Sequence, residues 1–241
     1  MEELERTPQI SFGRVLSWGA AVVGGMLIAS AWGWLTIPAG KMLPSHSDIY
    51  GRVNGWTSRD VALLAMPMLA IGVAVIGVIL GKLTPGWEGA QTAAHNWKLR
   101  EIVILAGLAV MGIIHVVFVM SCCGHISKST STLAGLFLAG VMLIITGNIL
   151  GKLRRNRLSG CRTPWSLASD VSWSKSNRLG GWLFVVCGVL VIAAVLATRS
   201  PIAVTVVLLA GLIISGLVVS VYSYLVWRSD PNRSPPVWWF E

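Results

Sequence analysis

Charged residues are scarce in this sequence. Lysine, arginine, aspartate and glutamate make up 12% of its 241 residues, and only 10 residues are acidic. A soluble domain has about 25% charged residues. Here 54% of the residues are hydrophobic, and the mean hydropathy is +0.71. The composition excludes an ordinary soluble domain and predicts an integral membrane protein.

Cysteine is also scarce, and its spacing is not that of a metal or redox centre. Cys122 and Cys123 are adjacent, whereas Cys161 and Cys187 stand alone. Neither arrangement matches a zinc-binding or dithiol motif. We therefore expect structural or free thiols, no metal and no cofactor. No spacing of nucleophile, base and orienting group stands out either, so we expect no catalytic residues and no enzyme.

Six stretches have the length and apolarity of a membrane span, which needs about 20 residues. They are residues 15–37, 61–81, 101–121, 131–151, 180–198 and 201–226. The sequence therefore predicts an all-α integral membrane protein with six transmembrane helices, the last two forming a helical hairpin. We expect no cleavable signal peptide, because the first residues, MEELER, are acidic where a signal peptide is positive.

The basic residues predict the orientation. Of the 19 lysines and arginines, 14 fall on the side of the amino terminus. Cytoplasmic loops carry the excess of positive charge. We therefore expect a multi-pass protein of the plasma membrane with both termini and the 152–179 loop in the cytoplasm, and with the 38–60 loop outside. The charge excess next to spans indicates contact with the lipid bilayer and not direct binding of nucleic acid.

The longest polar segment between two spans runs from residue 147 to residue 181. It holds seven basic residues and one acid, Asp170, together with Trp165 and Trp173. Arginine and tryptophan beside a membrane helix can anchor it at the lipid headgroups. Two interpretations stay open: a solvated loop that only sets topology, or a structured surface that binds a partner.

Within this loop, the residues around Arg162 predict a fixed geometry. Gly160 permits a tight turn, and Pro164 biases Thr163 toward an extended backbone. Arg162 could then fold back onto the terminal carbonyls of the fourth span, or bind a carboxylate or lipid phosphate as a two-pronged donor.

The 38–60 loop contains several turn-forming residues, namely Pro44, Gly51, Asn54 and Gly55. Its adjacent acid–base pair, His46 and Asp48, offers too few ligands for a metal site. We expect a hydrogen bond that stabilises the fold of the loop.

Polar and small residues also occur inside the spans. His115 lies deep in the third span, where an imidazole either has a function or is neutral and hydrogen-bonded to a neighbouring helix. We expect Asn148 to bond across helices. Small residues four apart, as in Gly77/Gly81, Gly147/Gly151 and Gly211/Ser215, predict close helix packing.

The 147–181 segment resembles the signature of the SdpI family, immunity proteins against a secreted sporulation-delaying peptide toxin. The matching positions are Gly147, Asn148, Asn156, Gly160, Arg162, Thr163, Pro164, Trp165, Trp173, Asn177, Arg178, Gly180 and Gly181. The outer loop resembles a small domain of unknown function, DUF1648, that often precedes this signature. Its matching positions are Pro44, His46, Gly51, Asn54, Gly55, Ser58 and Arg59.

Some positions depart from the two patterns. Arg155 stands in place of a proline, Asn177 in place of the usual histidine, and Asn54 in place of the usual aspartate. An amide does not titrate and is a poor metal ligand. A proton- or metal-dependent role at Asn177 is therefore not expected.

The resemblance implies a division of the chain. It gives an amino-terminal tail at 1–14, a DUF1648-like segment at 15–81, an SdpI-like region at 101–226 and a cytoplasmic tail at 227–241. The candidate binding residues are Asn148, Asn156, Gly160, Arg162, Thr163, Pro164, Trp165, Trp173, Asn177 and Arg178. In the outer loop they are Pro44, His46, Asp48, Gly51, Asn54 and Trp56.

The resemblance favours a non-enzymatic receptor in a bacterial plasma membrane. Such a receptor would bind a peptide toxin, protect the cell from it, and hold a cytoplasmic regulatory protein through the basic loop. The alternative is a transporter or exporter of a small amphiphile, with His115 in its pathway. Against the alternative, no predicted span has a carboxylate at its centre.

Overall fold

The computed structural model describes residues 10–48 and 53–236 of the chain. Its long helices are α1 (Gly13–Thr36), α2 (Arg59–Glu88), α3 (Ala90–Cys122), α4 (Lys128–Leu150), α6 (Asp170–Thr198) and α7 (Pro201–Ser229). A short helix, α5 (Pro164–Leu167), precedes α6, and the strands β1 (Met42–Ser47) and β2 (Val53–Ser58) separate α1 from α2.

The six predicted spans are confirmed as helices. In the described part of the chain, six helices are long and apolar enough to cross a membrane. The segment 82–100, between the second and third predicted spans, is helical except at one residue, because α2 continues to Glu88 and α3 begins at Ala90. Gly89 alone forms the turn, with a φ of 78° that favours glycine. The polar residues of this segment therefore lie on helix ends.

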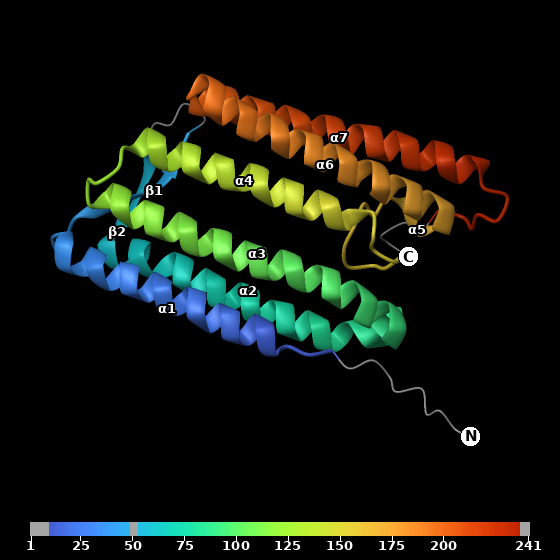
Figure 1. Cartoon of the computed structure of the whole chain (residues 1–241), viewed down its shortest axis with the longest axis horizontal. Coiled ribbons are helices and arrows are strands. Elements are labelled where there is room, and N and C mark those ends of the chain that lie inside the picture. The colour runs from blue at the N-terminus through green and yellow to red at the C-terminus, as the bar shows by residue number, and fades with distance from the viewer. Residues whose placement is uncertain (1–9, 49–52, 237–241) are drawn as a thin grey trace.

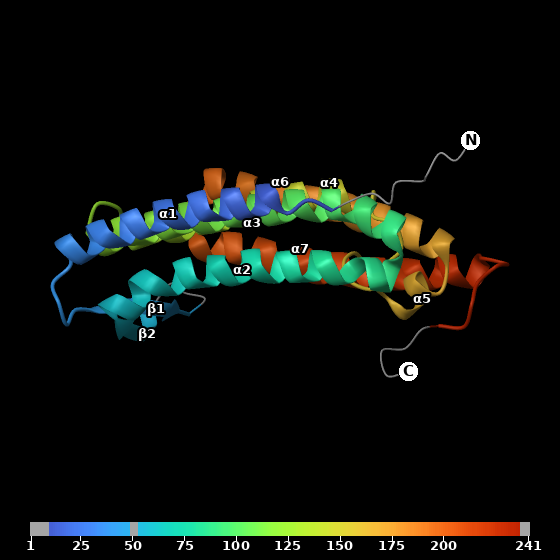
Figure 2. The ribbon, with the colours of Figure 1, turned by 90° about the horizontal axis from the view of Figure 1, so that it is seen from below.

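The helices form two groups of three. Helices α1, α2 and α3 pack on one another, as do α4, α6 and α7, and α3 contacts α4 across the seam between the groups. Figure 1 shows the long helices side by side, with the hairpin at one end and α5 at the other. The turned view in Figure 2 shows two layers, with α1, α3 and α4 in one and α2 and α7 in the other.

Glycines bring α4 and α6 into backbone contact. A Cβ on Gly147 would lie 2.6 Å from the carbonyl oxygen of Gly181, and one on Gly188 would lie 2.5 Å from that of Gly140. The predicted packing role of Gly147 is thus confirmed. Its partners in α6 were not predicted. Gly81 has a similar role, since a Cβ there would lie 2.5 Å from both Phe12 and Trp97.

The outer loop folds as an antiparallel β-hairpin, which the sequence analysis did not predict. His46 pairs with Gly55, and bulges interrupt the register on either side of His46. Asn54 and Gly55 lie within β2 and not in a turn, so their assignment as turn residues was wrong. A Cβ on Gly55 would lie 2.9 Å from that of His46, and glycine there permits the close approach of the strands.

His115 belongs to a hydrogen-bond cluster that connects α1, α2 and α3 inside the first group. Its imidazole is fully buried, and its Nε2 lies 2.9 Å from Ser30 Oγ. That hydroxyl also lies 2.7 Å from the Leu63 carbonyl oxygen and 3.0 Å from that of Met26. Its single proton goes to a carbonyl, so Ser30 accepts from Nε2–H. The hydrogen bond to a neighbouring helix that was predicted for His115 is present.

Both ends of the described chain lie at the α5 end of the bundle (Figure 1). An even number of spans requires this arrangement. It agrees with the prediction that both termini share one side of the membrane.

Candidate functional site

Residues 151–169, between α4 and α6, form a folded cap that is held by the start of α6. Trp173 is 2% exposed, and its Nε1 donates to the Leu153 carbonyl at 2.8 Å. Asn177 is 1% exposed, and its Oδ1 accepts from the Cys161 N–H at 2.8 Å. The prediction that 152–179 is one loop is therefore wrong in its second half, because α6 already begins at Asp170.

Gly160 lies against both of these side chains. Its φ is 114°, in the region that favours glycine. A Cβ at this position would lie 2.7 Å from Asn177 Oδ1 and 2.9 Å from the Trp173 ring. The predicted tight turn is confirmed, and the signature glycine is explained by space as well as by backbone conformation.

The Thr163-Pro164-Trp165 run starts α5 and docks it on α7. Thr163 has the extended backbone predicted from Pro164, and its hydroxyl accepts from the Ser166 N–H in a capping box. The same hydroxyl donates to Ser223 Oγ at 2.7 Å. The Trp165 ring meets that of Tyr224 edge-on, with centroids 5.4 Å apart. This part of the signature fixes the cap to the last span.

The predicted membrane-anchoring role of Trp165 and Trp173 is not what the structure shows. Trp173 is buried inside the cap, and Trp165 packs on α7. The reason is that each ring finds a partner on an adjoining helix. Arg162 folds back within the cap. Its Nη1 donates to the Arg157 carbonyl within the cap.

The end of α4 finds other partners. The Ile149 carbonyl accepts from the Lys152 N–H at 2.9 Å. Asn148 bonds to the Ile144 carbonyl of its own helix at 2.8 Å, so the expected bond across helices was wrong. Asn148 and Arg178 line a surface cavity of about 440 Å³ between α4 and α6.

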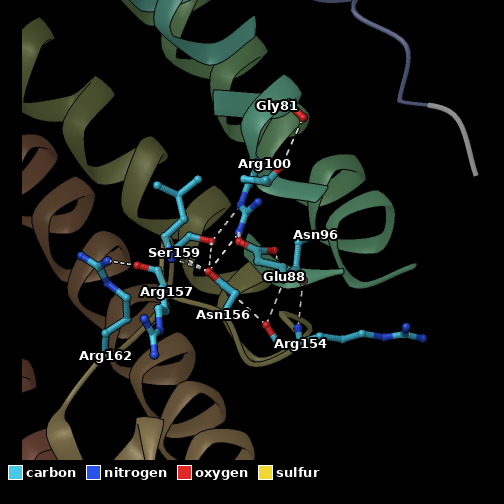
Figure 3. A network of polar contacts seen from close by, with 11 residues as sticks. Gly81, Glu88, Asn96, Arg100, Arg154, Asn156, Arg157, Ser159 and Arg162 are labelled. Carbon is cyan, nitrogen blue, oxygen red and sulfur yellow. Dashed lines mark hydrogen bonds and ion pairs between the residues drawn. The ribbon is translucent and has the colours of Figure 1, made fainter. Parts of the chain in front are cut away.

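A buried polar network joins the cap to the α2–α3 turn (Figure 3). Asn96 of α3 is fully buried and bonds to both the N–H and the carbonyl of Arg154. Arg100 forms an ion pair of 2.6 Å with Glu88, and these side chains are 10% and 2% exposed. The network thus couples the first helix group to the signature segment.

Asn156 is the signature residue at the centre of this network. It is 5% exposed, and its Oδ1 accepts from Arg100 at 2.9 Å. The same oxygen accepts from the N–H groups of Leu158 and Ser159. Glu88, Asn96 and Arg100 were not predicted as site residues. The signal in the sequence was a pair of opposite charges and an amide clustered next to a predicted span.

The polar contacts leave a cationic outer surface on the cap. The exposed basic side chains are Lys152, Arg154, Arg155, Arg157, Lys175 and Arg178. Among these, Arg155 pairs with Asp170 at 2.9 Å. The signature residues therefore hold the shape of the cap, and the surrounding arginines and lysines give it its charge.

Two titratable groups in the cap region have shifted pKa values. Burial raises the pKa of the Cys161 thiol to about 11. The Ser169 hydroxyl donates to Asp230 Oδ2 at 2.5 Å, and this bond, with one from the Asn232 N–H, lowers the pKa of Asp230. Asp230 thereby links the end of α7 to the start of α6. The four cysteines are free thiols, as expected.

At the other end of the bundle, the β-hairpin and the α3–α4 turn enclose a cleft of about 700 Å³. Pro44, His46 and Trp56 of the hairpin line it, opposite Phe118 of α3 and Lys128 of α4. The Trp56 ring is 54% exposed, and Lys128 Nζ lies 5.8 Å from its centroid.

His46 has a partner within the hairpin. Its Nδ1 lies 2.5 Å from Asn54 Oδ1, an oxygen that can only accept, so Nδ1 carries a proton. This bond matches the expected fold-stabilising role of His46, with Asn54 as the partner. Asp48 also has an interaction in the structure. Gly51, the remaining candidate of the outer loop, lies outside the described residues. Within 10–48 and 53–236, no three His, Cys, Asp or Glu residues are grouped as metal ligands.

The fold defines a multi-pass α-helical membrane protein. Residues 152–223 match the model of the SdpI/YfhL protein family, so this part of the chain is similar to that family. The matching region begins in the cap and ends in α7.

One curated relative is the immunity protein SdpI of Bacillus subtilis (strain 168). It is 40% identical over 52 residues, which are 22% of this chain and 25% of the relative. The chain therefore matches about a quarter of the length of that relative. No solved structure matches the chain.

Proposed function

We propose that this protein protects the cell that carries it from a secreted, membrane-active peptide, without acting as an enzyme. The match of residues 152–223 to the SdpI/YfhL family supports this proposal, as does the role of the relative as an immunity protein. The observation that carries it furthest is the cleft under the hairpin, which offers a binding surface at the end of the bundle opposite the cap.

The lining of the cleft suits an amphipathic peptide. Trp56 and Met42 are 54% and 51% exposed on the hairpin, and Phe118 adds a second ring from α3. Exposed aromatic side chains contribute much of the binding energy at protein interfaces. Lys41 and Lys128 add positive charge at the same cleft. We propose that the peptide is captured here, before it enters the bilayer.

The capture site requires a particular orientation. The excess of basic residues at the cap end favours that end as cytoplasmic. The cleft then faces outside, where a secreted peptide arrives.

We further propose that the cationic surface of the cap holds a cytoplasmic regulatory protein. Arginine guanidinium groups bind carboxylates in a two-pronged geometry, so the partner surface would be acidic. The buried network at Asn96 and Arg100 offers a physical connection between this surface and the first helix group, whose hairpin lines the cleft.

A challenge experiment tests the protective role. The gene is deleted from its host and restored on a plasmid, and both strains are treated with peptides secreted by the same and neighbouring species. We expect at least one peptide to kill the deletion strain selectively. Equal survival in all treatments, with altered efflux of a small amphiphile, would instead support the transporter hypothesis.

A further inference from the structure

Another cavity lies at the seam between the two helix groups. It has a volume of about 350 Å³ and extends from Gly77 of α2 and Thr146 of α4 to the cap, which it reaches at Ser159 and Gly160. Most of its lining is apolar, with Leu80, Trp97, Val103, Ile104, Ile149 and Leu150 among the residues. Pockets that bind small molecules measure roughly 300–1,000 Å³.

Arg100 supplies the charged part of this lining. Its side chain is 10% exposed. Its Nη2 donates to both Glu88 and Asn156, and its Nε donates to Ser159. Its Nη1 is buried without a partner. Native proteins rarely bury a donor in this state, because it has lost its water and gained no acceptor. The unpaired Nη1 therefore marks a position for an acceptor atom.

We propose that this seam is a binding site for one phospholipid of the surrounding bilayer. An acyl chain occupies the apolar part of the cavity, and a phosphate or ester oxygen of the same molecule accepts from Arg100 Nη1. The cavity is polar at one end and apolar at the other, as a lipid is. Arg100 and Ser159 lie toward the cap, whereas Leu80, Val103 and Ile104 lie deeper along α2 and α3.

A phospholipid fits this site better than a free anion does. Glu88 already neutralises Arg100 at 2.6 Å, so the site needs a hydrogen-bond acceptor more than a counter-charge. A free phosphate would leave the apolar part of the cavity empty. The bound lipid contacts α2, α3 and α4, of which α3 and α4 pack on each other across the seam. The proposal does not depend on the protective role.

Neighbouring residues of α3 provide a matched pair of variants. Val103 lines the cavity, whereas Ile102 is 49% exposed on the surface of the same helix. Val103→Phe fills the cavity, and Ile102→Phe adds the same ring on the outer surface. Neither residue belongs to the polar network.

The full-length protein is purified in detergent, mixed with dioleoyl phosphatidylglycerol, and studied by native mass spectrometry. We expect wild type and Ile102→Phe to retain one lipid, and Val103→Phe to retain it with an affinity about tenfold lower. Retention by Val103→Phe equal to that of Ile102→Phe would overturn the site.

A second variant tests the acceptor. Arg100→Gln combined with Glu88→Gln removes Nη1 without leaving an unpaired buried carboxylate. Circular dichroism first verifies the helix content of the variant. We expect the folded double variant to lose the retained lipid, and unchanged retention would overturn the assignment of Arg100. If the double variant does not fold, lipid retention by Val103→Phe alone decides whether the site exists.

Discussion

Asn96 holds the backbone of Arg154 as a neighbouring β-strand would. Its Oδ1 accepts from the Arg154 N–H at 2.9 Å, and its Nδ2 donates to the Arg154 carbonyl at 3.2 Å. The side chain is fully buried, so water cannot replace either bond. One amide of α3 thereby fixes the first residues of the cap, 58 positions further along the chain.

The first prediction follows from this pair. Asn96→Ala leaves the Arg154 N–H without its acceptor, at a cost of about 1–3 kcal/mol. The cap should then open more often, and trypsin should cut at Arg154, Arg155 or Arg157 about tenfold faster for each 1.4 kcal/mol lost. Digestion of the detergent-solubilised protein measures this. Asn148→Ala is the control, because Asn148 is exposed and bonds only within its own helix. Equal cleavage rates in the two variants would refute the role of Asn96.

The second prediction concerns Gly160. Gly160→Ala combines a left-handed backbone with a Cβ placed 2.7 Å from Asn177 Oδ1. Backbone strain and overpacking together should cost roughly 2–4 kcal/mol. Gly86→Ala is the control, because a Cβ there has no atom within 4 Å, and alanine favours the helix that contains Gly86. Thermal unfolding in detergent should show a lower Tm for Gly160→Ala only. A Tm of Gly160→Ala equal to that of wild type would show that the cap relaxes freely.

The third prediction concerns the thiol of Cys161, whose pKa burial raises to about 11. The thiolate is the reactive species, and it is a minor form at any pH well below this pKa. Alkylation of Cys161 by N-ethylmaleimide should therefore be slow at pH 7 and should rise about tenfold with each pH unit up to pH 10. Peptide mass spectrometry can measure the rate at this site. A rate that levels off near pH 8.5 would show an ordinary exposed thiol.

The six spans were predictable because lipid requires about 20 apolar residues in each, and charge interrupts them clearly. The α2–α3 turn was not predictable, since polarity alone does not distinguish a loop from a helix end. A single non-helical residue, Gly89 with its positive φ, separates α2 from α3. The hairpin was missed for a related reason: Asn54 and Gly55 suit a turn locally, but their pairing with β1 is a long-range contact.

The signature residues were located correctly as a group, but the roles of several of them could be seen only in the structure. Thr163 and Pro164 start a helix as their local chemistry predicts. Asn156, Trp173 and Asn177 each have a partner 16 or more positions away, which the residues next to them in the sequence do not indicate. The resemblance pointed to binding at these residues. The structure shows them bonded to the cap itself.

The fourth prediction concerns orientation. In a variant with the four cysteines replaced by alanine, Ser45→Cys should react with a membrane-impermeant maleimide on intact cells, and Arg157→Cys should not. Both native side chains are exposed. Native Cys161 is unsuitable as the inner reporter, because its raised pKa slows its reaction from either side. Labelling of Arg157→Cys but not Ser45→Cys would place the cap outside and invert the orientation.

The most direct test of the central claim compares two tryptophans in the survival assay. Trp56 and Trp87 are 54% and 55% exposed, but Trp56 lines the cleft and Trp87 lies near the end of α2, at the other end of the bundle. Each is replaced by alanine, and the concentration of the selective peptide that kills half the cells is measured at matched membrane expression. We predict that Trp56→Ala falls to the sensitivity of the deletion strain, while Trp87→Ala protects as wild type does. Full protection by Trp56→Ala would contradict capture of the peptide in the cleft.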